Sequence, residues 1–112
     1  MSESETIATE LIRAIQIAAR TGYTVYGLRQ VKKLVLHGKA KAIVIASNIQ
    51  PDAKRDLTYY AKLGNIPILL FPGTNMELGA LLGRPHSIQA LAIIDPGQSN
   101  ILELATRRGE QQ

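Results

Sequence analysis

Residues 42–46 read AIVIA, an apolar run in which polar and apolar positions do not alternate. A strand of this kind is buried on both faces, as happens when helices cover both sides of a sheet. Residues 66–71, IPILLF, form a second such run, and residues 88–94 are predicted to form the last strand. A fourth, shorter strand is predicted at residues 23–26, YTVY, because aromatic and β-branched side chains favour strands.

Amphipathic helices are predicted around these strands. The first spans residues 6–20, where apolar side chains recur at spacings of three and four, with Ser4 or Thr6 as its cap. Its buried side is predicted to comprise Ile7, Leu11, Ala14, Ile15 and Ala18. Thr74 and Glu77 have the spacing of a capping box, in which a hydroxyl and a carboxylate bond the free N–H groups at a helix start.

Further helices are expected over residues 28–35, from Asp52, and over residues 101–104. The alternation of helices and strands predicts an α/β protein, a three-layer α/β/α sandwich with a central mixed sheet of about four strands. We expect residues 1–112 to form a single domain in which residues 105–112 are a flexible tail.

The composition agrees with one globular domain and excludes several kinds of chemistry. The chain has 112 residues, of which 46% are hydrophobic, and it has no cysteine. A disulfide framework, a thiolate metal site and a cysteine nucleophile are therefore excluded. The acidic start MSESETIATE lacks the features of a signal peptide, and no apolar run has the roughly 20 residues of a membrane span. We expect a soluble, cytoplasmic protein.

Positive charge is concentrated in one segment. The formal net charge is +4, and no acidic residue lies between Glu10 and Asp52. Seven basic residues lie in this interval: Arg13, Arg20, Arg29, Lys32, Lys33, Lys39 and Lys41. This distribution predicts a basic face that suits a polyanion, although ordinary solvated helix surfaces explain it equally well.

No catalytic or metal-binding motif is found. His37 and His86 stand far apart without a carboxylate motif beside either, and no serine elbow or phosphate-binding loop occurs. Asp52 and Asp56 are spaced as an i, i+4 pair, but basic residues between them favour surface pairing and a helix-dipole role. We therefore expect no cofactor, no metal and no enzymatic activity.

Three junctions at strand ends remain as candidates for binding: residues 27–33, 47–51 and 83–88. In an open α/β sheet, ligands bind outside the carboxyl ends of the strands, and these junctions are predicted to share one edge. A helix N-terminus at Gly27 offers free N–H groups to a phosphate, and an amide such as that of Asn48 can read a base edge. These features favour an RNA surface. Each feature also has an explanation that involves no ligand: a turn glycine at Gly27, a solvated helix face at Lys33, an Asx turn at Asn48 and a surface histidine at His86.

Three stretches carry a resemblance to a known family: GLRQVKKLVLHGKAKAIVIASN at 27–48, PDAKRDLTYYAKLGNIPILLF at 51–71 and TNMELGALLGRPHSIQALAIIDPG at 74–97. Together they resemble the archaeal and eukaryotic large-subunit ribosomal protein family L-thirty-e. This is a branch of the kink-turn-binding family, which also includes the L-seven-Ae proteins of guide ribonucleoproteins. The resemblance runs from about Ile7 to Leu104 and implies binding of a sharply bent RNA internal loop closed by sheared G·A pairs.

The resemblance also implies roles for single residues. Gly27 and Leu28 would let the helix N-terminus approach the bend, Arg29 and Lys33 would meet phosphates, and Asn48 would contact a guanine of a sheared pair. The segment from Arg84 to Ile88 adds a cation, a stackable ring and an apolar residue, a mixture that holds a splayed base. From this chemistry and the resemblance together, the residues expected at the RNA are Gly27, Leu28, Arg29, Gln30, Lys33, Asn48, Arg84, Pro85, His86 and Ile88.

Two departures from the guide-ribonucleoprotein relatives favour the ribosomal branch. Arg29-Gln30 stands where those relatives have Asn-Glu, and residues 85–87 replace their hydrophobic-acidic loop. His86 and Ile88 would cover a flipped-out nucleotide, although some relatives have Phe at the position of His86.

The expected function is thus a non-catalytic structural constituent of the cytoplasmic large ribosomal subunit. Its expected partners are a kink-turn in ribosomal RNA and other large-subunit proteins, without a membrane or small-molecule substrate, and the free protein is expected to be a monomer. The alternatives are a kink-turn adaptor of a guide-RNA particle, a protein-interaction module or a small α/β enzyme that uses the same strand ends.

Overall fold

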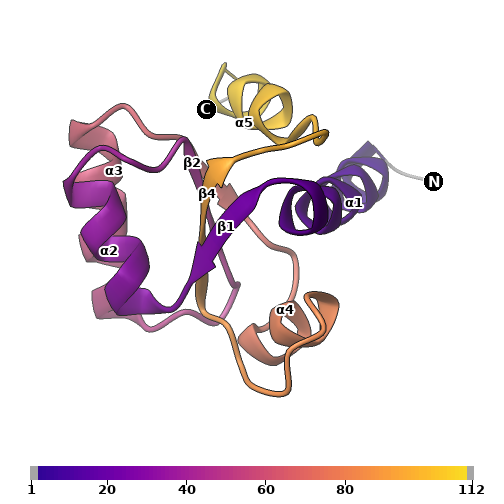
Figure 1. The fold of residues 1–112 in the computed structure, drawn as a ribbon, viewed down its shortest axis with the longest axis horizontal. Coiled ribbons are helices and arrows are strands. Elements are labelled where there is room, and N and C mark those ends of the chain that lie inside the picture. Colours follow the sequence, from indigo (N-terminus) through magenta and orange to yellow (C-terminus); the bar gives the residue numbers. More distant parts are fainter. Residues whose placement is uncertain (1–2, 111–112) are drawn as a thin grey trace.

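The computed structural model describes residues 3–110, and the side chains of residues 8–105 within them. Four strands form one sheet in the order β1-β4-β2-β3, with helices on both faces (Figure 1). The strands are β1 (Tyr23–Tyr26), β2 (Ala42–Ile45), β3 (Ile68–Leu70) and β4 (Ala90–Asp95). The helices are α1 (Glu3–Thr21), α2 (Leu28–Leu36), α3 (Pro51–Leu63), α4 (Asn75–Leu81) and α5 (Ile101–Glu110). The predicted three-layer α/β/α sandwich is confirmed.

The sheet is mixed. Strand β4 pairs antiparallel with both β1 and β2, whereas β3 pairs parallel with β2. Every residue of β2 is buried, as the unbroken apolar run predicts. Because β1, β2 and β3 point in the same direction, the loops that follow them lie at the same edge of the sheet.

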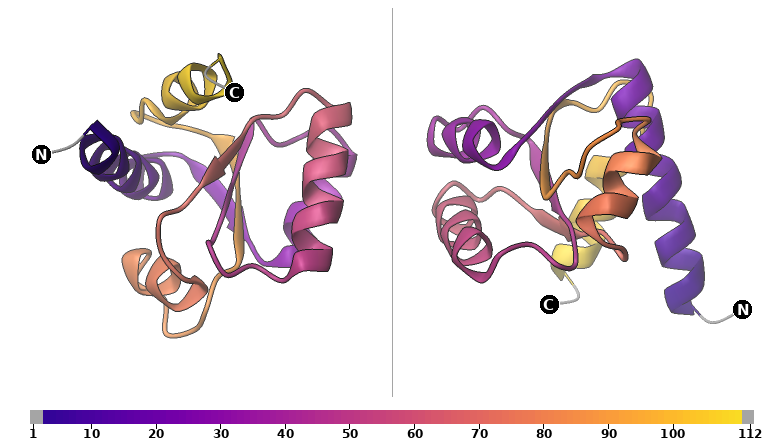
Figure 2. Two further views of the ribbon diagram at one scale, coloured as in Figure 1. Left: turned by 180° about the vertical axis from the view of Figure 1, so that it is seen from behind. Right: turned by 90° about the horizontal axis from the view of Figure 1, so that it is seen from below.

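The two faces of the sheet have separate cores. Helices α2 and α3 cover one face, and α1, α4 and α5 cover the other (Figure 2). Successive residues of β2 alternate between the cores: Val44 packs with the α1 side, and Ile43 and Ile45 pack with the α2–α3 side. Burial of such an aliphatic side chain contributes about 1.5–3 kcal/mol, so both helical layers stabilise the sheet.

The capping box at the start of α4 is confirmed. The Glu77 backbone N–H donates to Thr74 Oγ1 at 3.2 Å, and the Thr74 N–H donates to Glu77 Oε1 at 3.4 Å. These bonds satisfy two backbone donors that the helix itself leaves free. The first residue of α4 is consequently held in a defined position.

Element ends differ from the sequence prediction at several points. Helix α1 begins at Glu3, ahead of both predicted caps, and the side chain of Ile7 lies outside the described residues. Strand β3 is shorter than residues 66–71 because the Ile66 N–H closes the end of α3 on the Ala61 carbonyl, at 2.8 Å.

Helix α5 runs to Glu110, into the segment that the sequence predicts to be a flexible tail, and Ala105 is buried. Gln111 and Gln112 lie outside the described residues. None of the helices in residues 3–110 combines the length and the apolarity needed to cross a membrane.

Candidate nucleic-acid interface

The three predicted junctions meet at one edge of the sheet. The Gly27 N–H donates to the Ala90 carbonyl at 3.2 Å, which joins the start of α2 to the start of β4. The Ala46 N–H donates to the Gln89 carbonyl at 2.9 Å, and the Gln50 N–H donates to Gln89 Oε1 at 3.2 Å. The loops after β1 and β2 are therefore both bonded to Gln89 and Ala90, directly after the third junction, so the three junctions share one edge, as predicted.

Gly27 precedes α2 in a backbone conformation that few other residues adopt. Its φ is +111° and its ψ is 131°, and its carbonyl accepts the first helical hydrogen bond, from the Val31 N–H at 2.9 Å. No side chain caps this helix start, and no atom beyond Gly27 and its two chain neighbours lies within 4 Å of the position that a Cβ would occupy. The first N–H groups of α2 are thus accessible to an anion.

The first turns of α2 present exposed polar side chains beside this opening. Arg29, Gln30 and Lys33 are all exposed, and Arg29 and Lys33 are one helical turn apart. Leu28 is half-buried and packs against the core on the α2–α3 side of the sheet. Leu28 therefore fixes α2 on the sheet, while Arg29 and Lys33 remain available for phosphate.

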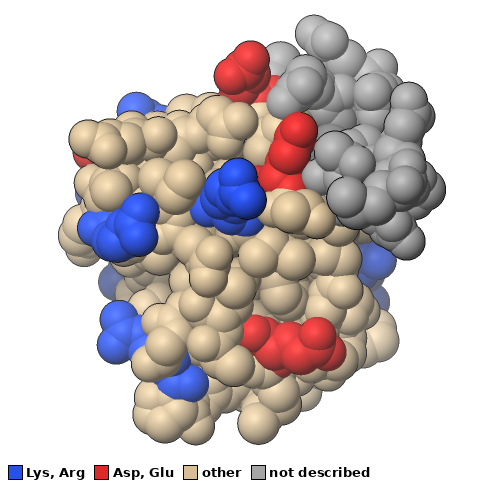
Figure 3. Space-filling model, turned by 90° about the vertical axis from the view of Figure 1, so that its right-hand side faces the viewer, with Lys and Arg blue, Asp and Glu red and all other residues tan. Residues whose placement is uncertain are grey.

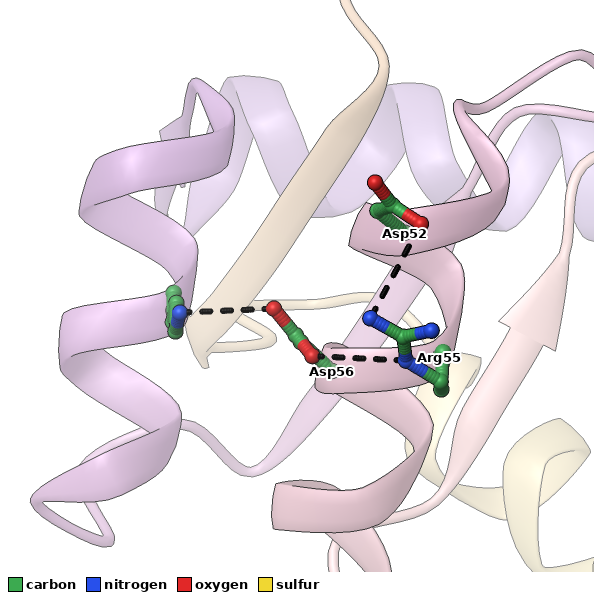
Figure 4. Close-up of polar contacts among 4 residues, drawn as sticks. Asp52, Arg55 and Asp56 are labelled. Atoms are coloured by element: carbon green, nitrogen blue, oxygen red, sulfur yellow. Dashed lines mark hydrogen bonds and ion pairs between the residues drawn. The ribbon is translucent and has the colours of Figure 1, made fainter.

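Lys32 differs from these two basic residues. Its Nζ lies 3.5 Å from Asp56 Oδ2 and 5.7 Å from the centre of the Tyr60 ring. The positive charge of Lys32 therefore pairs with groups of α3, where α2 and α3 meet. Arg55 in turn lies 3.7 Å from Asp52 and 3.9 Å from Asp56 (Figure 4). The surface pairing predicted for the two aspartates is confirmed.

Asn48 is exposed at the edge, and Asn75 holds its side chain. Asn48 Nδ2 donates to Asn75 Oδ1 at 2.9 Å, and the Asn75 backbone N–H donates to Asn48 Oδ1 at 2.7 Å. Asn75 Oδ1 also accepts from the Met76 N–H at 2.9 Å. Since an amide has two donors and two lone pairs on its oxygen, Asn48 keeps one of each for a further partner. These side-chain bonds replace the Asx turn that the sequence leaves open.

Sequence reasoning missed Asn75. The only available signal is its place directly after the capping residue Thr74, and nothing in the sequence indicates that this position lies beside Asn48. The contact depends on the parallel pairing of β2 and β3, which brings their following loops together.

Residues 84–86 surround the half-buried ring of Tyr26. The guanidinium carbon of Arg84 lies 4.8 Å from the centre of that ring. The His86 and Tyr26 ring centres are 6.1 Å apart, with the ring planes tilted by 42°. Arg84, Pro85 and His86 are exposed. This loop thus presents a cation and a stackable ring, the combination that holds unpaired bases.

Ile88 lies in the core. Its side chain is 2% exposed, and its N–H donates to the Asn75 carbonyl at 2.9 Å. The Ile88 side chain is therefore not accessible to a nucleotide, contrary to the prediction. Ile88 instead anchors the loop. Gly79 supports the same loop, because a Cβ there would overlap the His86 carbonyl.

The seven basic residues between Glu10 and Asp52 do not form one face. Arg13 and Arg20 lie on α1, and three others lie on α2. Lys39 and Lys41 precede β2, at the edge opposite to Asn48. On the α1 and α4 side of the molecule, Lys and Arg side chains are scattered: several lie toward the left, one lies near the centre beside an acidic side chain, and others lie at the right-hand edge (Figure 3). The prediction of a single basic face is corrected to separate groups.

No metal site was found in the part of the chain described, where no three His, Asp or Glu side chains form a group able to hold an ion. His37, one of the two histidines, has its Nδ1 atom 2.8 Å from the Lys33 carbonyl. What the edge offers is a surface of amides, cations and open N–H groups.

Comparison with known proteins identifies the family. The model of the ribosomal protein L7Ae/L30e/S12e/Gadd45 family matches residues 9–103, and the chain belongs to this family. It is 51% identical over 92 residues to the large ribosomal subunit protein eL30 of Pyrobaculum calidifontis, a match that covers 82% of this chain and 91% of that protein. It is 48% identical over 95 residues to the protein of the same name from Pyrobaculum islandicum, covering 85% and 94%. The corresponding protein of Methanopyrus kandleri is 36% identical over 102 residues, covering 91% and 94%.

Proposed function

We propose that this protein is a structural constituent of the large ribosomal subunit, where it binds a kink-turn in ribosomal RNA and stabilises the bent form. The relatives are named as large-subunit proteins, and they are matched over most of their length. The proposed role is binding rather than catalysis.

One observation carries the proposal most directly: the exposed Asn48 amide is fixed by Asn75 at the same edge as the open start of α2. A base edge needs a donor and an acceptor at defined positions, and the Asn48–Asn75 pair supplies them. The N–H groups after Gly27 would meet phosphate at the bend, because nothing in the protein occupies the space beside Gly27.

Charge and stacking complete the proposed interface. Arg29 and Lys33 would contact the RNA backbone, with Gln30 as a polar neighbour on the same exposed turn. Arg84 and His86, arranged around Tyr26, would hold an unpaired nucleotide, and Pro85 would line the same loop. Recognition would then depend on RNA shape together with a few base contacts.

The proposal is tested by titrating the protein against a kink-turn RNA and against the same RNA with its sheared G·A pairs replaced by Watson–Crick pairs. Tight binding of the first RNA alone supports the proposal, and equal binding contradicts it. A second comparison, between a ribosomal kink-turn and one from a guide RNA, separates the ribosomal role from that of a guide-RNA adaptor.

A further inference from the structure

A groove runs between α1 and α4, beside the interface described above. Its larger part has a volume of about 470 Å³ and is lined by Arg13, Gln16 and Arg20 of α1 and by Leu82 beyond α4. The three α1 side chains recur at spacings of three and four, so they lie on one face of the helix. Arg13 and Arg20 are separated by about 10 Å along the helix axis, at a rise of 1.5 Å per residue.

A second hollow adjoins the first. It has a volume of about 200 Å³ and shares Ala19 and Leu82 with the larger one. Tyr23, Tyr26 and Arg84 line it. The two hollows together extend from Arg13 to Arg84, a residue that also belongs to the proposed kink-turn interface.

The arginines of this groove are not held in ion pairs within the described residues. No acidic side chain lines either hollow, and no ion pair involves Arg13, Arg20 or Arg84 among the residues that the structure describes. Lys32 and Arg55, by contrast, are paired with aspartates. Three arginines without an ion pair along one groove suit a chain of regularly spaced negative charges.

An exposed aromatic ring lies in the same groove. The Tyr23 side chain is 61% exposed, although its ring is one of the largest apolar surfaces that this chain could bury. Every base has a flat face that can stack on such a ring. Arginine and tyrosine together therefore favour single-stranded RNA over an acidic protein segment, which would leave the Tyr23 ring without a matched partner.

We propose that the groove holds an unpaired strand of RNA that leaves the kink-turn, with phosphates on Arg13 and Arg20 and a base stacked on Tyr23. This inference rests on the proposed function, because Arg84 joins the groove to the kink-turn interface. It extends the RNA-binding surface from the edge of the sheet to the outer side of α1.

The test compares three RNAs: a minimal kink-turn, and the same kink-turn with unpaired nucleotides added at the 5′ or at the 3′ end. The variant Arg13→Gln/Arg20→Gln removes the two α1 charges. Its matched control, Lys39→Gln/Lys41→Gln, removes two charges of the same basic segment at the opposite edge of the sheet. Far-ultraviolet circular dichroism and a urea titration check that both variants fold.

We expect one extended RNA to bind the unmodified protein more tightly than the minimal RNA. Arg13→Gln/Arg20→Gln should abolish this gain, which amounts to roughly tenfold or more near 0.1 M salt. It should also reduce the salt slope of log Kd for the extended RNA by roughly 1.4, since each single-strand phosphate contact contributes about 0.7. The control should keep both the gain and the slope.

Several outcomes would overturn the proposal. These are an absent gain from either extension, an unchanged gain in Arg13→Gln/Arg20→Gln, or an equal loss in the control, which would mean that only overall charge matters. Failure of the minimal kink-turn to bind the unmodified protein would instead reject the proposed function itself.

Discussion

Asn48 and Asn75, 27 positions apart in the sequence, are joined by two hydrogen bonds of 2.9 and 2.7 Å at the edge of the sheet. The first lies in the loop after β2, and the second is the first residue of α4. In the proposed function, Asn48 contacts a base and Asn75 holds it in position. This division of roles can be tested with a pair of substitutions.

Asn48→Ala should lower the affinity for a kink-turn RNA by about 1–3 kcal/mol, as expected for a lost base-edge contact. Asn75→Ala should lower it as well, because the Asn48 amide then loses its partner. In the double variant the two losses should not add, with a coupling of about 0.5–3 kcal/mol. Titrations of all four proteins at fixed salt measure this coupling, and Met76→Ala, at an exposed neighbouring position, is the control. Strictly additive losses would mean that Asn75 does not position Asn48.

Gly27→Ala should lower both stability and RNA affinity. The φ of +111° at this residue is strained for alanine, and the expected loss in the free energy of unfolding is about 1–3 kcal/mol. The added methyl group would also occupy the open space in which we place the RNA backbone.

Gly38→Ala provides the matched control for Gly27→Ala. Gly38 has a φ of +67° and open space around its Cβ position, but it lies beyond the far end of α2. The Gly38→Ala variant should be less stable than the unmodified protein, as measured by urea unfolding, and should keep its RNA affinity. Wild-type RNA affinity in Gly27→Ala would remove the start of α2 from the interface.

Lys33→Ala should weaken RNA binding and reduce the salt slope of log Kd by about one. Lys32→Ala should change the slope less, because Asp56 already pairs with Lys32. Lys39→Ala, at the opposite edge, should leave the slope unchanged. The measurement is a titration at several salt concentrations. Equal slopes for Lys33→Ala and Lys39→Ala would show that Lys33 is an ordinary solvated side chain.

Thr74→Ala should lower the free energy of unfolding by about 0.5–2 kcal/mol, because it removes the side-chain oxygen of the capping box. Thr58→Ala, at an exposed position inside α3, should cause no such loss, since alanine favours a helix interior. Urea unfolding of both variants measures the difference. Equal stability of the two would contradict a capping role for Thr74.

The layers of the fold could be predicted from the sequence because each depends on local patterns. The unbroken run at residues 42–46 predicts a central strand, and the spacing of Thr74 and Glu77 predicts the start of α4. The ends of the strands were less predictable, since the shortening of β3 depends on the hydrogen bond from the Ile66 N–H to the end of α3.

The candidate site divides in the same way. Gly27 could be predicted as the opening of a helix, because its position between a strand and an apolar stripe is a local signal. The Asn48–Asn75 contact and the burial of Ile88 depend on the order of the strands, which no local pattern contains. The single basic face could not be tested by local patterns either, because the Lys and Arg residues of the segment lie on separate elements.

The central claim is that this edge of the sheet recognises a bent RNA by its shape. The most direct measurement is the dissociation constant, at fixed salt, for a kink-turn RNA and for the same RNA with Watson–Crick pairs in place of its sheared G·A pairs. The account predicts tight binding of the kink-turn and only weak, salt-sensitive binding of the paired RNA. Equal affinity for the two RNAs would contradict it.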